Sequence, residues 1–288
     1  MQMDTAELIS HVKDSDAFHV PMFVWRALPE GFRDPHPGSI KLPVVDLFGY
    51  EFQLTKFMVL ELLAALLIVV VFIPLARWIA TGQAPRGPIW NFFEAMLLFL
   101  RDEVARPAIG GKEADRFLPY IWTVFFFVLF CNLLGLVPWM GSPTGAIACT
   151  GTLAVATLVT VVGAGMKKYG VLGYLIGQVP HMELPLVMSI LIKPMIFFIE
   201  IFGLAIKHIV LSVRLFANMF AGHLVMAVIV GFIGIVAHQG LLLWSAVTTV
   251  SVLGATAIAL LELFVAFLQA YIFAFLSALF IGMAVHQH

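Results

Sequence analysis

Residues 189–236 read SILIKPMIFFIEIFGLAIKHIVLSVRLFANMFAGHLVMAVIVGFIGIV, and residues 241–285 read LLLWSAVTTVSVLGATAIALLELFVAFLQAYIFAFLSALFIGMAV. At 1.5 Å per residue, each run would form a helix about 70 Å long. The hydrocarbon core of a bilayer is only about 30 Å thick, and ordinary helix tilt does not absorb the difference. Breaking either run would need polar turns, but its glycines stand alone in apolar sequence. We therefore expect two long, steeply tilted antiparallel helices that form a hairpin, with a partner protein rather than lipid on one side.

The composition of the whole chain is that of a membrane protein. Of its 288 residues, 61% are hydrophobic and only 11% are charged, whereas soluble proteins carry about 25% charged residues. Apolar runs of about 20 residues favour helices over a β-barrel, so we expect an all-α polytopic membrane protein. A net charge of −1 argues against nucleic acid as a partner. Both cysteines, Cys131 and Cys149, lie in apolar segments, and nothing indicates a disulfide or a metal site.

We divide the chain into an extramembrane N-terminal tail, residues 1–55, and a membrane domain, residues 56–288. The tail is polar, contains prolines and has room for one amphipathic helix, but it lacks the basic and apolar regions of a signal peptide. In the membrane domain we expect a first span at 57–76, an interfacial or hairpin helix at 85–112, spans at 117–137 and 145–166, and the long tilted hairpin at 189–236 and 241–285.

The distribution of Lys and Arg predicts the orientation. Positive charge lies in region 77–116 and at Lys167 and Lys168, whereas the connection 138–146 has no charge. Basic loops stay in the cytoplasm. These two basic regions are therefore expected in the cytoplasm, and the N-terminus outside.

Arg214 is the last basic residue, because residues 215–288 contain no Lys or Arg and only one acid, Glu262. An arginine near a bilayer centre costs roughly 2.5–3.5 kcal/mol on insertion scales, which makes it a candidate functional residue. Facing residues of an antiparallel hairpin have position numbers with a constant sum. A single register, with its apex near residue 242, lets Arg214 face Gln269 and His223 face Glu262.

The register indicates two sites on different faces of the first long helix. Asn218 lies one turn from Arg214 on the same face, whereas His223 points to the opposite side, about 13.5 Å further along the axis. Structural interpretations stay open for the other polar residues. A Glu–His pair can be structural, and Asn and Gln often join helices. Lys193, Glu200 and Lys207, spaced by seven residues, fit either a hydrated stripe or snorkelling charges.

Three segments carry a family resemblance. They are SVRLFANMFAGHL (212–224), ALLELFVAFLQAYIFAFL (259–276) and CNLLGLVPW (131–139), the last with Asn132 and Pro138 at recurring positions. Together, and in this order, they closely resemble subunit a of the F-type ATP synthase over residues 57–288. The resemblance implies a non-catalytic membrane subunit of a proton-transporting two-sector ATPase. Its implied partners are the c-ring, the peripheral-stalk b subunits and the lipid bilayer.

The resemblance also implies roles for the residues of the arginine site. Two offset half-channels would lead protons to membrane carboxylates on the c-ring, and Arg214 would face the ring between them. Arginine stays charged even when poorly hydrated, favours an ionised carboxylate and repels a proton that would leak directly across. Gln269 would hold Arg214 or relay to it, and Asn218 lies on the same face.

Four more residues would line the half-channels of the family. His223 and Glu262, with Asn132, would belong to the half-channel open to the outside. In some bacterial members the acid and the histidine are exchanged between the two helices; the order here is that of mitochondrial and alphaproteobacterial-type members. Glu200 matches the carboxylate of the cytoplasmic half-channel. Gly135 stands where some members carry Asp, so no acidic role is expected there.

The function expected is that of a proton-translocating stator subunit of F-type ATP synthase, with no catalytic residues, cofactor or metal. The sequence has no G-x-x-x-x-G-K-[ST] nucleotide motif. A stand-alone ion-coupled secondary transporter is the alternative, but it should show two repeated halves, and no such repeat is seen. A structural scaffold would leave Arg214 without a role. The His223–Glu262 pair favours protons over sodium, and the charged tail favours a bacterial plasma (inner) membrane over a mitochondrial inner membrane.

Overall fold

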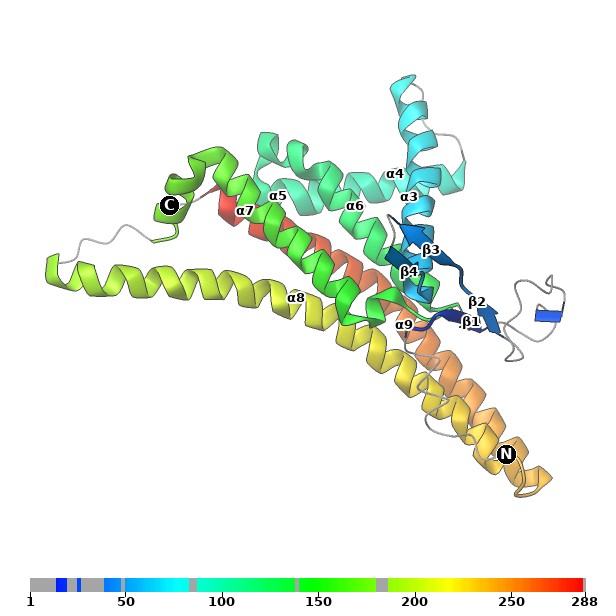
Figure 1. The fold of residues 1–288 in the computed structure, drawn as a ribbon. Coiled ribbons are helices and arrows are strands. Elements are labelled where there is room, and N and C mark those ends of the chain that lie inside the picture. The colour runs from blue at the N-terminus through cyan, green and yellow to red at the C-terminus, as the bar shows by residue number, and fades with distance from the viewer. Residues whose placement is uncertain are drawn as a thin grey trace. The chain divides into compact units, whose positions relative to one another are not determined.

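The computed structural model describes residues 14–19, 25–26, 39–47, 50–82, 87–137, 140–179 and 186–286. Its described part is dominated by helices (Figure 1). Five of them are long and apolar enough to cross a membrane: α3 (Lys56–Ala80), α6 (Gly111–Gly135), α7 (Ile147–Gly177), α8 (Leu186–Val236) and α9 (Leu241–Val285). The predicted all-α polytopic class is therefore confirmed.

The chain forms two compact units, and the first comprises Met1–Val71, Phe127–Cys149 and Leu215–Gln269. Four short strands lie in the described part of the tail, and Trp25 and Arg26 are helical; the amphipathic helix that we expected there stays a prediction. Strand β1 (Ala17–His19) pairs antiparallel with β2 (Ser39–Lys41), and β3 (Val44–Leu47) with β4 (Tyr50–Gln53). The β-branched and aromatic residues of β3 and β4 suit a strand. Residues 1–13, 20–24 and 27–38 lie outside the described residues.

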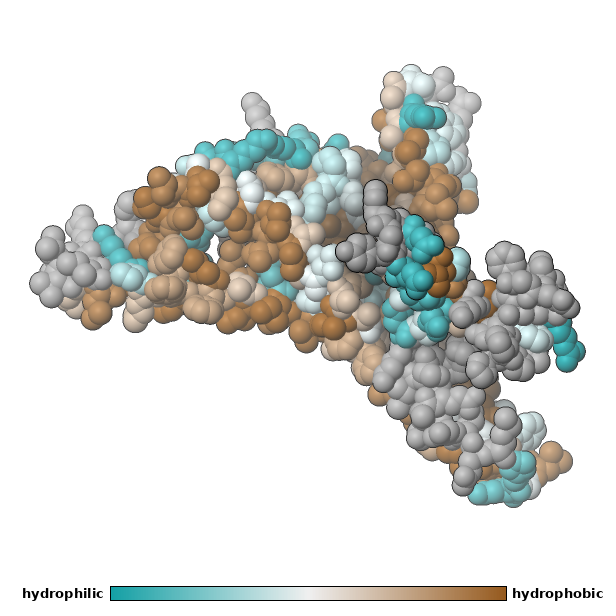
Figure 2. All heavy atoms as spheres, in the orientation of Figure 1, coloured by the Kyte–Doolittle hydropathy of each residue, from teal (hydrophilic) through white to brown (hydrophobic). Residues whose placement is uncertain are grey.

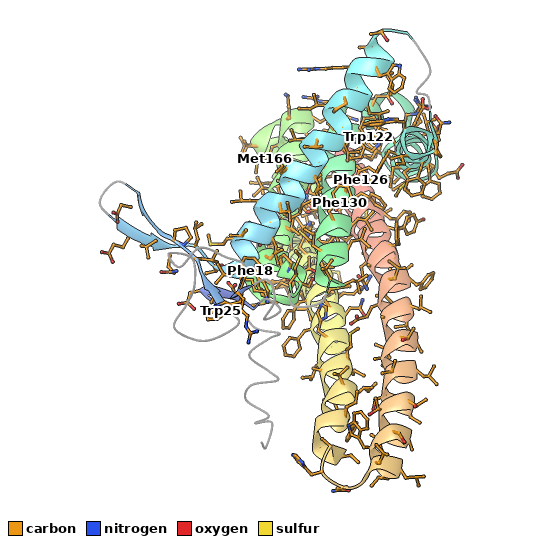
Figure 3. All side chains as sticks on the ribbon, turned by 90° about the vertical axis from the view of Figure 1, so that its right-hand side faces the viewer. Phe18, Trp25, Trp122, Phe126, Phe130 and Met166 are labelled. Atoms are coloured by element: carbon orange, nitrogen blue, oxygen red, sulfur yellow. The ribbon has the colours of Figure 1, made fainter. Side chains whose placement is uncertain are left out.

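A hairpin of α8 and α9 makes up the rest of the first unit. The two helices lie side by side up to their turn (Figures 1 and 3). Gly240 makes the turn possible because its φ of +108° is one that other residues rarely adopt. The backbone N–H of Trp244 donates to Gly240 O at 2.9 Å, which starts α9. Each long apolar run thus remains a single helix.

The second unit comprises Phe72–Phe126, Thr150–Arg214 and Ala270–His288. Aromatic side chains fill part of its core: the ring of Phe126 lies 4.4 Å from that of Phe72 and 6.1 Å from that of Phe93. Next to Phe126 on α6 (Figure 3), Trp122 donates from Nε1 to Leu97 O at 3.1 Å. Such aromatic packing suits a helix bundle, since each ring buries a large apolar area and Trp needs a partner for its N–H.

The segment expected as one interfacial or hairpin helix, residues 85–112, is divided in the structure. It contains α4 (Pro88–Phe99), a π-helical turn η2 (Leu100–Ala105) and the short α5 (Arg106–Ile109). Helix α5 ends at Gly110, because the φ of Gly110, +96°, does not continue a helix; α6 begins at the next residue. On η2, the carboxylate of Asp102 accepts hydrogen bonds from Arg101 and Arg106, both at 2.9 Å.

Helix α7 also departs from the expected span at 145–166, because it runs on to Gly177. Its two parts join at Gly170, where φ is 75° and ψ is 166°. The kink follows Lys167 and Lys168, the basic residues that close the expected span. Glycine permits it because a side chain would be strained at this φ.

The long helices expose large apolar side chains. On α8 they include Phe198, Phe202 and Ile209, and on α9 Leu253, Leu260 and Phe264. Figure 2 shows hydrophobic residues over much of the visible face of α8. Such continuous apolar surface needs lipid or another protein beside it.

Candidate functional site

The acid of the long hairpin packs against α8 within the first unit, at the residue before the expected histidine. Glu262 on α9 is only 5% exposed, and its side chain packs on Gly222 of α8: a Cβ added there would lie 2.9 Å from Glu262 Cδ. His223 follows Gly222 directly. Glu262 Oε2 and His223 Nε2 are both buried, and neither has a hydrogen-bond partner in the described part of the chain. An unpaired buried polar atom costs about 1–3 kcal/mol, so each of these two atoms destabilises the unit unless water or a partner reaches it.

A chain of hydrogen bonds runs from the α6–α7 connection to α9 in the same unit. Thr144 donates from Oγ1 to Asn132 Oδ1 at 2.6 Å, and Asn132 donates from Nδ2 to Ala266 O at 3.4 Å. Ser142 Oγ lies 2.7 Å from Thr144 Oγ1. Because the hydroxyl hydrogen of Thr144 is used toward Asn132, Ser142 is the donor of this pair. Ala266 lies one turn after Glu262, so the chain leads to the helix face that carries the acid.

Gly135 makes room for this chain. A Cβ added at Gly135 would lie 3.0 Å from the Cα of Ser142, so the connection could not pack as it does against an aspartate at this position. Asn132 was expected from the sequence, but Ser142 and Thr144 were not. Their signal was present: they are the only hydroxyl residues of a connection that carries no charge. Pro138, the other family position, lies outside the described residues.

Two charged residues of α3 were not singled out from the sequence. Lys56 is 1% exposed, and its backbone N–H donates to Ser15 O at 2.8 Å. The next N–H, of Phe57, donates to Asp14 Oδ1 at 3.1 Å, so the tail is tied to the first turn of α3. Glu61, one turn further on, is half-buried. The signal missed was a basic and an acidic residue within an apolar helix.

Arg214 has no counter-charge of its own. Its side chain is exposed, and no ion pair of the described residues includes it. Arg214 belongs to the second unit and Gln269 to the first, so their pairing stays a prediction. Asn218, one turn beyond Arg214 on α8, is half-buried, and its Nδ2 finds no partner within the described chain.

Glu200 lines a cavity of about 360 Å³ in the second unit. Polar side chains reach this cavity from α7 and α8 and from the residue after α9: Tyr174, Gln178, Glu200, Lys207 and His286. A water molecule occupies about 30 Å³ in the liquid, so the cavity has room for several. Among the residues that the structure describes, no group of three His, Cys, Asp or Glu side chains could hold a metal ion.

The fold and these sites define a multi-pass helical membrane protein with polar groups buried between its spans. The family model for the ATP synthase A chain matches residues 58–282. ATP synthase subunit a of Myxococcus xanthus (strain DK1622) is 41% identical over 284 residues, which cover 96% of this chain and 88% of that protein. ATP synthase subunit a of Chloroherpeton thalassium (strain ATCC 35110 / GB-78) is 38% identical over 251 residues, with 86% and 71% covered.

The chain therefore belongs to the ATP synthase A chain family. Its role is that of the a subunit of an F-type ATP synthase, which serves ATP synthesis and ion transport in a membrane. The resemblance found in the sequence is confirmed. The alternative of a stand-alone transporter is not supported.

Proposed function

We propose that this subunit provides two offset half-channels for protons, which lead to the carboxylates of a c-ring so that ion flow drives ring rotation. The observation that carries the proposal is the exposed, unpaired guanidinium of Arg214 in the apolar sequence of α8. An arginine at membrane depth is normally paired or faces water. No acid of the described residues forms an ion pair with Arg214. The counter-charge therefore comes from a partner protein, as a carboxylate of the c-ring.

Arg214 then acts on each carboxylate as the ring turns. Its positive charge favours the ionised form of the carboxylate, so a proton leaves before the carboxylate passes. The same charge repels a proton that would cross without turning the ring. By the resemblance Gln269 would hold Arg214 or relay to it, and Asn218 lies one turn from Arg214 along α8.

The half-channel on the outer side uses the first unit. Ser142, Thr144 and Asn132 form its hydrogen-bonded lining, and Glu262 with His223 exchanges the proton with the ring. The free Oε2 and Nε2 atoms of this pair support the assignment, because a proton-exchanging group needs an unoccupied position. The imidazole can pass a proton between its two nitrogens.

The half-channel on the cytoplasmic side uses the cavity of the second unit, with Glu200 as its carboxylate. The basic residues near this cavity, Lys168 and Arg116, support a cytoplasmic position by the positive-inside rule. The N-terminus then lies outside. The bacterial relatives favour a bacterial plasma (inner) membrane, where the c-ring and the b subunits of the peripheral stalk are the partners.

ATP-driven proton pumping in inverted membranes that carry Arg214→Ala tests the proposal. Co-purification of the c-ring checks that the complex assembles. Arg101→Ala is the matched control, because Arg101 is a half-buried arginine outside the spans. We expect Arg214→Ala to abolish pumping and to leave a passive proton leak. Normal pumping by an assembled Arg214→Ala complex would contradict the proposal.

A further inference from the structure

His286, the residue after α9, stands at one edge of the cavity in the second unit. It lines the cavity together with Glu200 and Lys207, yet 56% of its side chain is exposed. It therefore borders both the cavity and the water around the molecule.

The position of His286 is built by close backbone packing. A Cβ at Gly282 would lie 3.0 Å from the carbonyl carbon of Ala108, and a Cβ at Gly110 would lie 3.2 Å from His286 Nε2. On the other side, Tyr169 donates its hydroxyl to Val285 O at 2.7 Å. The end of α9 is thus held against two neighbouring segments, which fixes the imidazole in one place.

The hydrogen bonds of the ring fix which nitrogen is free. His286 Nε2 lies 2.7 Å from Ile109 O, and a carbonyl oxygen only accepts. Nε2 therefore carries a hydrogen and donates it to Ile109. In the neutral ring Nδ1 is then the acceptor, and a proton from the cavity can bind there.

A carboxylate beside the ring suits the charged form. Glu113 Oε2 lies 3.7 Å from His286 Nε2, and its Oε1 accepts a hydrogen bond from Lys168 Nζ at 2.7 Å. Lys168 keeps Glu113 ionised and in place, and Glu113 in turn stabilises an imidazolium when one forms.

We propose that His286 exchanges protons between the cavity and the water outside it. The proposal rests on the proposed function, because it takes the cavity as the cytoplasmic half-channel. In the synthesis direction a proton leaves the cavity water and binds Nδ1. The imidazolium then releases this proton from Nδ1 to cytoplasmic water or buffer beyond the cavity, and the ring becomes neutral again.

Other titratable and charged groups face this position from every neighbouring element. They are Glu113 at the start of α6, Lys168, Tyr169 and Tyr174 on α7, and Glu200 and Lys207 on α8. A pH profile of the complex therefore contains several contributions. The contribution of His286 to the pH profile is therefore obtained by comparing the unchanged complex with a variant in which only His286 is replaced.

His286→Gln is that variant in the assembled ATP synthase, because the glutamine amide can still donate to Ile109 O but cannot take up a proton at neutral pH. In inverted membranes the cytoplasmic side faces the medium, so the pH of the medium can be varied directly. As the pH of the medium is varied, we expect the unchanged complex to show a step in ATP-driven pumping, and His286→Gln to lose it.

The rate of pumping should also fall, by about tenfold. This is less than the roughly 100-fold lower end for an enclosed acid–base group, because water reaches the cavity edge. His286→Gly with added imidazole is the second test, and free imidazole should restore pumping several-fold. His238→Gln, an exposed histidine at the α8–α9 turn, is the matched control and should keep the profile.

An unchanged pH step in His286→Gln, with or without a lower rate, would overturn the proposal and leave His286 as a structural tether. Absence of imidazole rescue in an assembled His286→Gly complex would do the same. The Arg214→Ala variant distinguishes failure of this proposal from failure of the proposed function. If Arg214→Ala abolishes pumping but His286→Gln has no effect, only the proton exchange at His286 is refuted. If Arg214→Ala pumps normally, the proposed function is refuted.

Discussion

Gly222→Ala probes the close contact between α8 and the buried acid of α9. A Cβ at Gly222 would lie 2.9 Å from Glu262 Cδ and 3.1 Å from Cγ, whereas ordinary contacts measure 3.4–4 Å. The carboxylate must therefore move by about 0.5–1 Å, a shift that a flexible side chain can make at small cost in stability. Alanine also favours a helix over glycine by about 1 kcal/mol, so the hairpin should form normally.

The functional effect should be much larger than the effect on stability. A displacement of about 1 Å in a reacting group can lower a rate about 100-fold, so we expect proton flow to fall about 10- to 100-fold. ATP-driven pumping and passive proton conduction in membranes stripped of the soluble sector measure this flow. Co-purification of the c-ring confirms assembly.

Gly203→Ala is the matched control, because it lies on the same helix and a Cβ there meets nothing within 4 Å. It should pump at the unchanged rate. Pumping at that rate by Gly222→Ala would refute the reasoning, since the position of Glu262 would then have no bearing on proton flow.

Two more predictions concern a buried bond and an exposed one. Thr144→Val keeps the side-chain volume but leaves Asn132 Oδ1 without its 2.6 Å hydrogen-bond donor. This variant should lose about 1–3 kcal/mol of unfolding free energy and pump more slowly. Thr249→Val, at an exposed position, should change neither quantity, and thermal unfolding and pumping assays measure both. The hydrogen bond from Arg101 holds the pKa of Asp102 below its ordinary 3.8. The stabilisation by Asp102 is therefore present above pH 3.8 and lost as the pH falls below it. Asp102→Asn should lower the unfolding temperature at pH 7 and leave it unchanged near pH 2; an equal effect at both would contradict the ion pair.

The long helices could be predicted because their cause is local. Uninterrupted apolar sequence excludes polar turns, so both runs stay helical from end to end. The exact pairing across the hairpin stays a prediction. Glu262 lies against Gly222, the residue before its predicted partner His223, and one residue along a helix turns a side chain by about 100°.

The contacts that the sequence did not predict depend on packing between distant segments. Ser142 and Thr144 reach Asn132 only because the connection folds back onto α6. The division of residues 85–112 depends on a π-helical turn, a one-residue change in hydrogen bonding that no periodicity reports. In the tail, short strands are stabilised by their pairing, which local sequence does not specify.

The polar groups of this subunit are incomplete in a consistent way. Among the described residues, Arg214 forms no ion pair with an acid, and Glu262 Oε2 has no hydrogen-bond donor. Either state is costly in a hydrocarbon environment if nothing completes it. A structural membrane protein would pair such groups internally or replace them with apolar residues. Unpaired groups are useful where an outside partner must pair with them in turn, because a permanent internal partner would compete with it. The cost in stability is therefore the physical reason for the exchange that we propose, with a passing carboxylate at Arg214 and a passing proton at Glu262.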